Sequence, residues 1–502
     1  MPKIRINEVD NTGIASLPST TSVAYIPGAA ANPIAPRLFT SAREFEKAFA
    51  ENTDYIVDKS ADLAHHLLTL GLNVLYECLV LEGSSGDPAA IKTVEYVIPM
   101  TEIIVSGGSI LTFAIDGIDY TIDTLREVVT WTVDDTPNTA EIITNLGIPS
   151  AILENGLEVT FDFITKKASY EKEYDMSGKP NVDWKKLEDK AMYDIRFLTT
   201  GGYRCPSEDM VKCAAKRVDA IALIDCEELE DSALECRAWF DNFLGSIINT
   251  ETGEYALEIL EYTKGSTEDP LAFAAAFTPY WKGNIHGVAG WKDVEEIPAS
   301  FGYLFAFARS VQNNPIWYAA AGSFRGLIPE LISVGVEYTT ADIEVLQSRA
   351  KDEEVALDDA GDNVGIALNP IALVKPFGHI VWGNRTLRFN HVNEATNIGI
   401  TKATSFLNCR VLGTEVAKSL YHAARKYTFE QNSVVLWTNF RSEVTPLLDK
   451  MESGNGILGY TFKKVATDKK ARLKAHVTII PIEGVEDFDM DIEMTDNITV
   501  SA

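Results

Sequence analysis

Two neighbouring histidines, His65 and His66, are the residues that most suggest a metal site. Adjacent residues on a helix point in different directions, so the two rings cannot hold one ion as a pair spaced four residues apart would. The alternating acids of residues 487–491 have the spacing of a calcium loop, but Ile492 occupies the sixth position, where such a loop needs glycine. Residues 358–362 form another acidic cluster that could hold a cation, although a solvated turn explains it better. We therefore predict no metal site.

The motifs that bind phosphates or activate a nucleophile are missing from the sequence. No G-x-x-x-x-G-K-[ST] loop occurs, and Gly283, Gly287 and Gly290 lack the spacing of a dinucleotide-binding loop. The G-x-S-x-G turn of many serine hydrolases is also missing, because Ala321 stands two residues before Ser323. The sequence therefore predicts no catalytic residue and no cofactor.

The cysteines are scattered and form no C-x-x-C pair, which disfavours a zinc site. We expect buried thiols in a reducing compartment rather than disulfides. The six are Cys78, Cys205, Cys213, Cys226, Cys236 and Cys409.

Length and composition indicate a globular protein of roughly two to four domains, since the chain has 502 residues, 46% of them hydrophobic and 23% charged. The longest apolar stretches have the length of strands, well short of the roughly 18 residues that a membrane span needs. Residues 1–10 alternate charged and apolar side chains, unlike a secretory signal. We therefore expect neither membrane insertion nor Sec export.

Charge is distributed unevenly along the chain. The net charge of −29 argues against a broad nucleic-acid-binding surface. Residues 396–482 nevertheless hold 13 Lys and Arg against 6 Asp and Glu, a net charge of +7. This asymmetry suggests two surfaces with different partners, although a solvated face of mixed charge would give the same count.

Hydrophobic periodicity predicts a mixed α/β chain interrupted by a β-rich segment. Thr, Val and Ile are enriched between residues 91 and 168, with turn signals between the apolar runs, which indicates a separate and mostly β module. Elsewhere, a helix, an apolar strand and a second helix in succession imply a covered sheet. Helices are expected at residues 41–50, 61–70, from 207 onwards and at 232–244, and strands at 74–81 and 220–224.

The basic segment near the C-terminus is expected to fold as an α+β module. A helix at about residues 412–429 has Val416, Leu420 and Ala423 on its apolar face and Lys418 among the charged residues on the rest of its surface. A second helix is predicted at residues 442–451, followed by a Gly-rich turn and two strands, around 463–474 and at 477–482.

Both ends of the chain alternate polar and apolar residues, as strands do, and neither has a partner strand nearby in the sequence. Each terminal strand either folds back on its own domain or pairs with the sheet edge of another molecule, and the pattern leaves both alternatives open. The apolar positions are Ile4, Ile6 and Val9 at one end and Phe488, Met490, Ile492 and Met494 at the other.

Residues 369–371, Asn-Pro-Ile, and residues 381–387, Val-Trp-Gly-Asn-Arg-Thr-Leu, resemble a pattern near the end of the main domain of contractile tail sheath proteins. The resemblance covers nearly the whole chain, although residues 91–178 are similar only as a β-sandwich insertion. Residues 29–32 and 297–300 depart from the loop sequences that are usual in the family. Further similar segments follow the family's order at residues 21–28, 39–45, 222–225, 280–281 and 298–309.

This resemblance implies a structural protein, not an enzyme, with a multi-domain α/β fold. The family's main domain is subtilisin-like in fold, carries an inserted β-sandwich-like domain and is followed by a small α+β domain, with an extended strand arm at each end. On this chain the implied segments are an arm at residues 1–20, the main domain at 21–90 and 179–395, the insertion at 91–178, the C-terminal domain at 396–482 and an arm at 483–502.

In this family the terminal strands cross to neighbouring subunits and extend the sheet of the neighbours' C-terminal domain. The resemblance therefore implies a chain that polymerises with itself in a helix around an inner tail tube protein, and that contracts to drive the tube through a host cell envelope. Baseplate and tail terminator proteins would be further partners, without direct contact to nucleic acid. The implied location is the contractile tail of a virion assembled in the host cytoplasm.

We further expect the basic C-terminal domain to line the lumen and hold an acidic inner tube. The expected tube-facing residues are Lys418, Arg425, Lys426, Lys463, Lys464, Lys469, Lys470, Arg472 and Lys474.

Two alternatives remain open. The chain could be the sheath of a phage-tail-like bacteriocin or of another contractile injection system, which follows the same physics. More remotely, it could be an α/β hydrolase-type enzyme, because an α/β core with acidic clusters can support hydrolysis and a fold alone does not determine function.

Overall fold

The computed structural model describes residues 22–482 except 31, 53, 83–90, 106–107, 116–117, 134–135, 146–147, 154–156, 176–177, 206, 227–231, 250–253, 256–269, 348–366, 391–402 and 467–471. Both predicted terminal arms, with Ile4, Ile6, Val9, Phe488, Met490, Ile492 and Met494, lie outside the described residues. The acidic cluster at residues 358–362 and the predicted tube-facing Lys469 and Lys470 lie outside them as well.

An eight-stranded sheet forms the centre of the molecule, in the strand order β2-β3-β1-β16-β17-β20-β24-β25. The six strands from β3 to β24 are parallel to their neighbours, and β2 and β25 pair antiparallel at the two edges. The strands are β1 (Val23–Ala29), β2 (Ile34–Phe39), β3 (Asn73–Leu79), β16 (Phe197–Leu198), β17 (Ile221–Asp225), β20 (Ala274–Thr278), β24 (Leu368–Val374) and β25 (Gly378–Val381).

Helices cover both faces of this sheet, so the central strands are buried from end to end, as parallel strands usually are. One hydrophobic core joins the sheet to α1 (Ala42–Glu51), α2 (Lys59–Thr69) and α7 (Ala299–Asn313). The other core joins it to α4 (Glu208–Arg217), α5 (Ala233–Ile247) and α9 (Thr340–Gln347). The covered sheet expected from the sequence is therefore present.

Local signals in the sequence explain where these helices begin and end. The hydroxyl of Ser41 accepts a hydrogen bond from the Glu44 amide and caps α1, and the Asp58 carboxylate does the same for α2. Acidic residues occupy the first turn of α4 and basic residues its last turn, which suits the helix dipole. The helices predicted at 41–50, 61–70, 207 onwards and 232–244 are confirmed to within a few residues.

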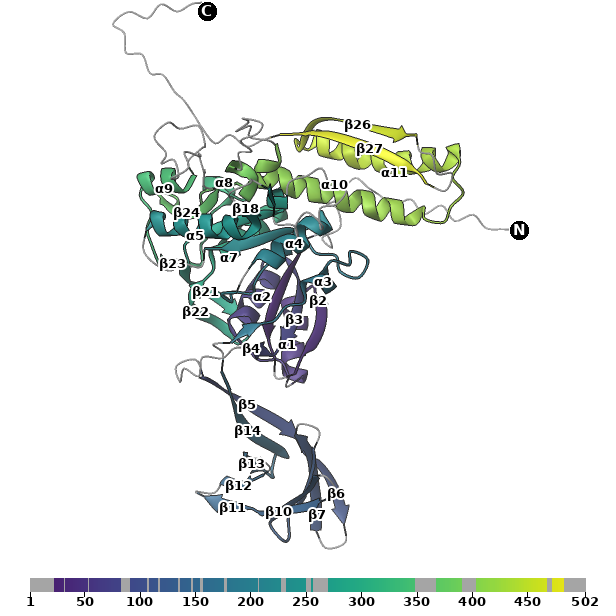
Figure 1. The fold of residues 1–502 in the computed structure, drawn as a ribbon. Coiled ribbons are helices and arrows are strands. Elements are labelled where there is room, and N and C mark those ends of the chain that lie inside the picture. Colours follow the sequence, from purple (N-terminus) through teal and green to yellow (C-terminus); the bar gives the residue numbers. More distant parts are fainter. Residues whose placement is uncertain are drawn as a thin grey trace, which may run out of the picture.

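The β-rich segment forms a sandwich of two five-stranded antiparallel sheets, β10-β9-β8-β7-β6 and β11-β12-β13-β14-β5. Its own hydrophobic core lies between the sheets and includes Phe113, Trp131 and Phe161. The long strands β5 (Ile91–Pro99) and β14 (Lys167–Asp175) run side by side where the segment leaves the main body. Figure 1 shows the sandwich at the end of the molecule farthest from α10 and α11.

The remaining strands of the sandwich are β6 (Thr101–Val105), β7 (Gly108–Ile115), β8 (Ile118–Asp123), β9 (Val128–Val133), β10 (Thr136–Glu141), β11 (Ile143–Asn145), β12 (Ile148–Ile152) and β13 (Glu158–Asp162). A separate three-stranded sheet of β21 (Trp281–Gly287), β22 (Gly290–Ile297) and β23 (Leu331–Val334) packs against α2.

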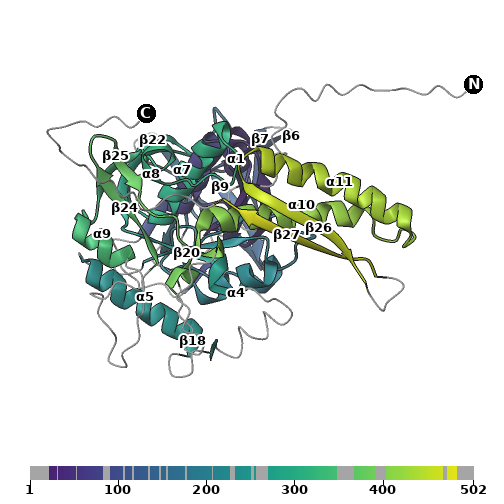
Figure 2. The same ribbon diagram turned by 90° about the horizontal axis from the view of Figure 1, so that it is seen from above.

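The C-terminal module consists of α10 (Leu407–Lys426), α11 (Val434–Ser453) and a hairpin of β26 (Ile457–Val465) and β27 (Lys474–Pro481). These four elements extend together from the main body in both views (Figures 1 and 2). The expected element types are present, but three boundaries were wrong. Helix α10 begins five residues earlier than predicted, and α11 begins at Val434 instead of residue 442. Most of β26 lies before the strand that was predicted around residues 463–474.

The described residues include no helix long and apolar enough to cross a membrane. They also include no group of three or more His, Cys, Asp or Glu side chains arranged to hold a metal ion.

Candidate functional site

The motif that resembles sheath proteins is a clamp between the central sheet and the start of α10. The Asn369 amide, on β24, donates to the carbonyl oxygens of Ala276 and Arg385 at 3.0 and 2.9 Å, and its side-chain oxygen accepts from the Arg385 amide at 2.8 Å. A Cβ on Gly383 would lie 2.7 Å from the Asn369 Cα, so only glycine fits between the two segments. The two halves of the motif, ten residues or more apart in sequence, therefore form one unit.

The next residues of the motif hold the N-terminus of α10. Asn384 accepts from the Asn408 amide at 3.0 Å and its own amide group donates to the Asn408 side chain at 2.7 Å. The Thr386 amide donates to the Ser405 carbonyl oxygen at 2.9 Å. The first amides of a helix lack intrahelical partners. The Asn384 side chain accepts from one of them and so stabilises the beginning of α10.

A buried ion pair fixes α10 about two turns further along. The Arg196 backbone lies in the central sheet, where its amide donates to Val23 and its carbonyl oxygen accepts from Ile221. Its side chain crosses to α10, forms an ion pair with Glu415 and donates to the Thr414 hydroxyl at 3.0 Å. The side chains of Arg196 and Glu415 are both fully buried. Loss of one partner would leave a buried charge without compensation, so the pair constrains the position of the helix strongly.

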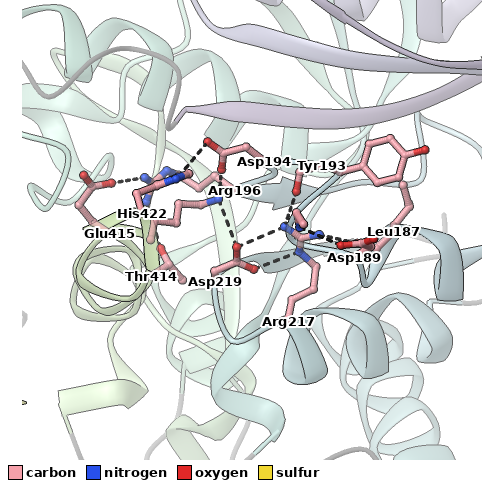
Figure 3. Close-up of polar contacts among 12 residues, drawn as sticks. Leu187, Asp189, Tyr193, Asp194, Arg196, Arg217, Asp219, Thr414, Glu415 and His422 are labelled. Carbon is pink, nitrogen blue, oxygen red and sulfur yellow. Dashed lines mark hydrogen bonds and ion pairs between the residues drawn. The ribbon is translucent and has the colours of Figure 1, made fainter. Parts of the chain in front are cut away.

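Lys418 extends this network by one more turn of α10, and Figure 3 shows the Arg196, Asp194 and Asp219 side chains of the network. Its ammonium group forms an ion pair with Asp194 and lies 3.5 Å from the Asp219 carboxylate. Arg217, at the end of α4, donates to both oxygens of Asp219 at 3.0 and 3.2 Å and to the Tyr193 carbonyl oxygen at 2.8 Å. Burial lowers the pKa of Lys418, and the two nearby carboxylates oppose that shift.

The prediction that Lys418 faces an inner tube was wrong. The residue is 1% exposed and points from α10 into the main body. The sequence could not show this, because lysines are rarely buried unless paired, and the paired acids, Asp194 and Asp219, lie about 200 residues away in the chain.

Two stripes of α10 have different environments. Val411, Glu415 and Lys418 recur at helical spacing and face the main body, where Val411 joins the first core. Leu412, Val416 and Ala423 form the other stripe and pack with Phe440 and Phe462 of α11 and β26. The helix is therefore shared between the main body and the C-terminal module.

The hairpin presents two open sheet edges. β26 and β27 pair only with each other among the described strands, so the outer edge of each lacks a described partner strand. The face that carries Phe462 and Val477 packs on the helices, and the opposite face carries the pairs Thr461–Thr478 and Lys463–His476. Such edges can accept an added strand through main-chain hydrogen bonds.

The other predicted tube-facing residues lie on different parts of the module. Lys463 and Lys474 lie on the outer face of the hairpin, as their cross-strand partners His476 and Val465 show. Arg425 is exposed near the end of α10, where Lys426 forms an ion pair with Glu443 of α11. Lys464 is also exposed, on β26, and Arg472 is exposed just before β27. The described part of the predicted set therefore does not form one surface.

One cluster at the carboxyl ends of the parallel strands could be mistaken for a hydrolytic site. The carboxylate of Asp225, the last residue of β17, accepts from the Ser300 amide at 2.7 Å and from the Ser300 hydroxyl at 2.6 Å. Burial raises the pKa of Asp225 to about 7, although the Ser300 hydrogen bonds oppose the shift. This arrangement caps α7 from the sheet.

The two histidines that first suggested a metal site have structural roles on α2. His65 lies 2.8 Å from both the His286 carbonyl oxygen and the Glu46 carboxylate. His66 accepts from the His286 amide at 3.1 Å and donates to Glu330 at 3.0 Å. Burial lowers the pKa of His66 to about 3, and the Arg309 charge adds to the effect. Both rings therefore join α2 to β21.

Sequence reasoning missed Arg196, Arg217 and Asp219. With Glu415 and Lys418 they form the network of buried charges that anchors α10 on the main body, called the anchor below. A signal was present, because Arg196 stands directly before Phe197 and Leu198 in a segment that must be buried. A charged residue in such a position needs a partner of opposite charge.

No protein-family model matches the chain, and no curated protein matches it either. Among solved structures, it is similar to a chain in the cryo-EM structure of the anti-feeding prophage baseplate, with a TM-score of 0.48, 12% identity and 99% of each chain covered. It is also similar to a chain of the sheath complex of the extracellular contractile injection system PVC in its contracted state, with a TM-score of 0.40, 17% identity, and 64% of this chain and 78% of that chain covered.

Proposed function

We propose that this chain is a structural subunit of a contractile sheath, and that it polymerises by lending its terminal strands to the β26–β27 hairpins of neighbouring copies. The observation that carries this proposal is the hairpin itself. It has a packed inner face and two outer edges without a described partner strand. The chain also ends in two sequences of strand period, at residues 3–10 and 487–494.

The anchor of α10 supports separate roles for the main body and the hairpin. Buried ion pairs hold the near half of α10 on the main body, so the hairpin is presented in a fixed direction. Each hydrogen bond between paired strands contributes a net free energy of about 0.5 to 1.5 kcal/mol, so an arm that forms several of them can stay attached. The main bodies could then change their packing while the strand links persist. A head-to-tail contact of this kind, which does not close on itself, generates a helix.

The basic residues support a second contact, with an acidic inner tube protein. Because Lys418 is buried, we assign this contact to exposed residues, with Lys463 and Lys474 on the outer face of the hairpin as its centre. Contacts between exposed charges weaken with salt, which would allow the tube to slide free. Baseplate and tail terminator proteins would contact the ends of the polymer.

The function is tested by electron microscopy of the purified full chain and of chains that lack residues 1–20, residues 483–502 or both. The full chain should form tubes or short polysheaths, and the doubly truncated chain should remain monomeric with an unchanged melting temperature. Tubes formed by the doubly truncated chain would refute the strand-exchange mechanism. A discrete full-length monomer under every assembly condition would refute the sheath function.

The tube contact has its own test. A chain carrying Lys463→Glu and Lys474→Glu should still polymerise but should lose salt-sensitive binding to an acidic tube protein. Arg425→Glu with Lys426→Glu serves as the matched variant at the end of α10, and it should have the smaller effect. Equal loss in both variants would show that the hairpin face is not the centre of the contact.

A further inference from the structure

Two of the six cysteines lie close together at the carboxyl ends of two inner strands of the central sheet, β17 and β20. Cys226 follows β17 and Cys236 lies near the start of α5, and both are buried, with exposed fractions of 1% and 3%. The Cys226 amide donates to the Phe277 carbonyl oxygen at 3.0 Å, and the Cys236 sulfur lies 3.3 Å from the hydroxyl of the next residue, Thr278. The side chain of Cys226 hydrogen-bonds to that of Cys236. Both cysteines therefore lie beside the end of β20.

The surroundings of Cys236 favour its thiolate form. The Tyr338 hydroxyl lies 3.3 Å from the Cys236 sulfur and 2.9 Å from the Thr278 hydroxyl. Hydrogen bonding from Cys226 is the largest cause that lowers the pKa of Cys236, to about 6, and the hydroxyls of Thr278 and Tyr338 add to it against the effect of burial. A thiolate is the form of cysteine that reacts with oxidants.

Burial raises the pKa of two other buried cysteines, unlike that of Cys236. Cys213, on α4, is exposed to the same 1% as Cys226, but burial raises its pKa to about 12. Burial also raises the pKa of Cys78, on β3. Burial alone therefore does not explain the lowered pKa of Cys236. Its hydrogen-bonding partners explain it.

We propose that Cys226 and Cys236 are a redox site that closes to an internal disulfide in the presence of a peroxide. The Cys236 thiolate attacks one peroxide oxygen, which breaks the O–O bond and gives a sulfenic acid and hydroxide. The Cys226 sulfur then displaces the sulfenic oxygen, which leaves as water with the thiol proton, and the S–S bond forms. Both thiols are oxidised by one electron each, and one peroxide is reduced to two waters.

The bond would tie the end of β17 to the start of α5 across nine intervening residues. The two sulfurs must approach to the bond length of roughly 2 Å for the bond to form. A thiol such as dithiothreitol would reverse the reaction by exchange.

The test is thiol counting on the full chain. The protein is treated with hydrogen peroxide, unfolded and alkylated with N-ethylmaleimide, and its intact mass is measured. The untreated chain should carry six adducts, one for each cysteine, and the oxidised chain four. Trypsin leaves both cysteines in the peptide of residues 218–237, which should lose the mass of two hydrogens. Six adducts after treatment, or loss mapped to other cysteines, would overturn the proposal.

Three variants sharpen the test. Cys213→Ser should keep the reaction, with three adducts after oxidation, whereas Cys236→Ser should abolish the peptide's mass loss. Tyr338→Phe removes one donor without removing either thiol, so it should slow the oxidation several-fold and leave the product the same. An unchanged rate in Tyr338→Phe would contradict the activation of Cys236 by its hydroxyl partners.

Discussion

The two halves of α10 carry charges in opposite situations. In the near half, Glu415 and Lys418 are buried and paired with residues of the main body. In the far half, Arg425 and Lys426 are exposed, and Lys426 pairs with Glu443 on its own module. Charges on one helix thus serve two purposes: the buried ones fix the direction of the helix, and the exposed ones remain available to a partner.

The largest effect is expected from the buried pair. Glu415→Gln keeps the size of the side chain but leaves the Arg196 charge without its ion-pair partner, so the free energy of unfolding should fall by about 3–5 kcal/mol. Denaturant unfolding measures the change. The matched control is Arg196→Met with Glu415→Leu, which removes both charges and should recover most of the loss. A cost below that of an ordinary surface substitution in Glu415→Gln would show that the pair does not anchor α10.

A buried carboxylate that is partnered by a hydroxyl and an amide should behave differently from one partnered by a cation. Asp225 has a folded pKa of about 7 against an ordinary value of 3.8, so the unfolded chain ionises first. Stability should therefore fall as pH rises from about 4 to 7, by at most about 4 kcal/mol from this group. Asp225→Asn should flatten the dependence of the unfolding free energy on pH in that range. The same slope in wild type and variant would contradict the raised pKa.

The smallest effect is expected at the far end of α10. Lys426 is largely exposed, so solvent screens its ion pair with Glu443. Lys426→Ala should leave the midpoint of denaturant unfolding nearly unchanged, in contrast to Glu415→Gln. A loss similar to that of Glu415→Gln would remove the distinction between the two halves of the helix.

Much of the fold could be predicted from the sequence because local signals determine it. Enrichment in Thr, Val and Ile with turn signals indicated the mostly β module, and helical spacing located several helices, the first of which Ser41 caps in the structure. The start of α11 was predicted at Ser442, eight residues too late, although Ser433 caps the helix by accepting from the Leu436 amide.

The candidate site was predictable only in part. The Asn369 and Arg385 segments were recognised by resemblance, and the structure supplies the physical reason, a side-chain clamp that begins α10. The buried position of Arg196 signals that it needs an acidic partner, but Glu415 lies 219 residues away and nothing local identifies it as that partner. Lys418 was assigned to the surface for the same reason.

The central claim is that the terminal strands pair with the hairpins of other copies. It is tested most directly with a photoreactive residue at Ile492 in a polymer assembled from an equal mixture of ¹⁴N-labelled and ¹⁵N-labelled chains. Mass spectrometry should find cross-links from residue 492 to β26 or β27, with peptides of mixed isotope labelling that identify two different copies. Cross-links confined to peptides of one label would mean that the strand folds back on its own chain, and would contradict the account.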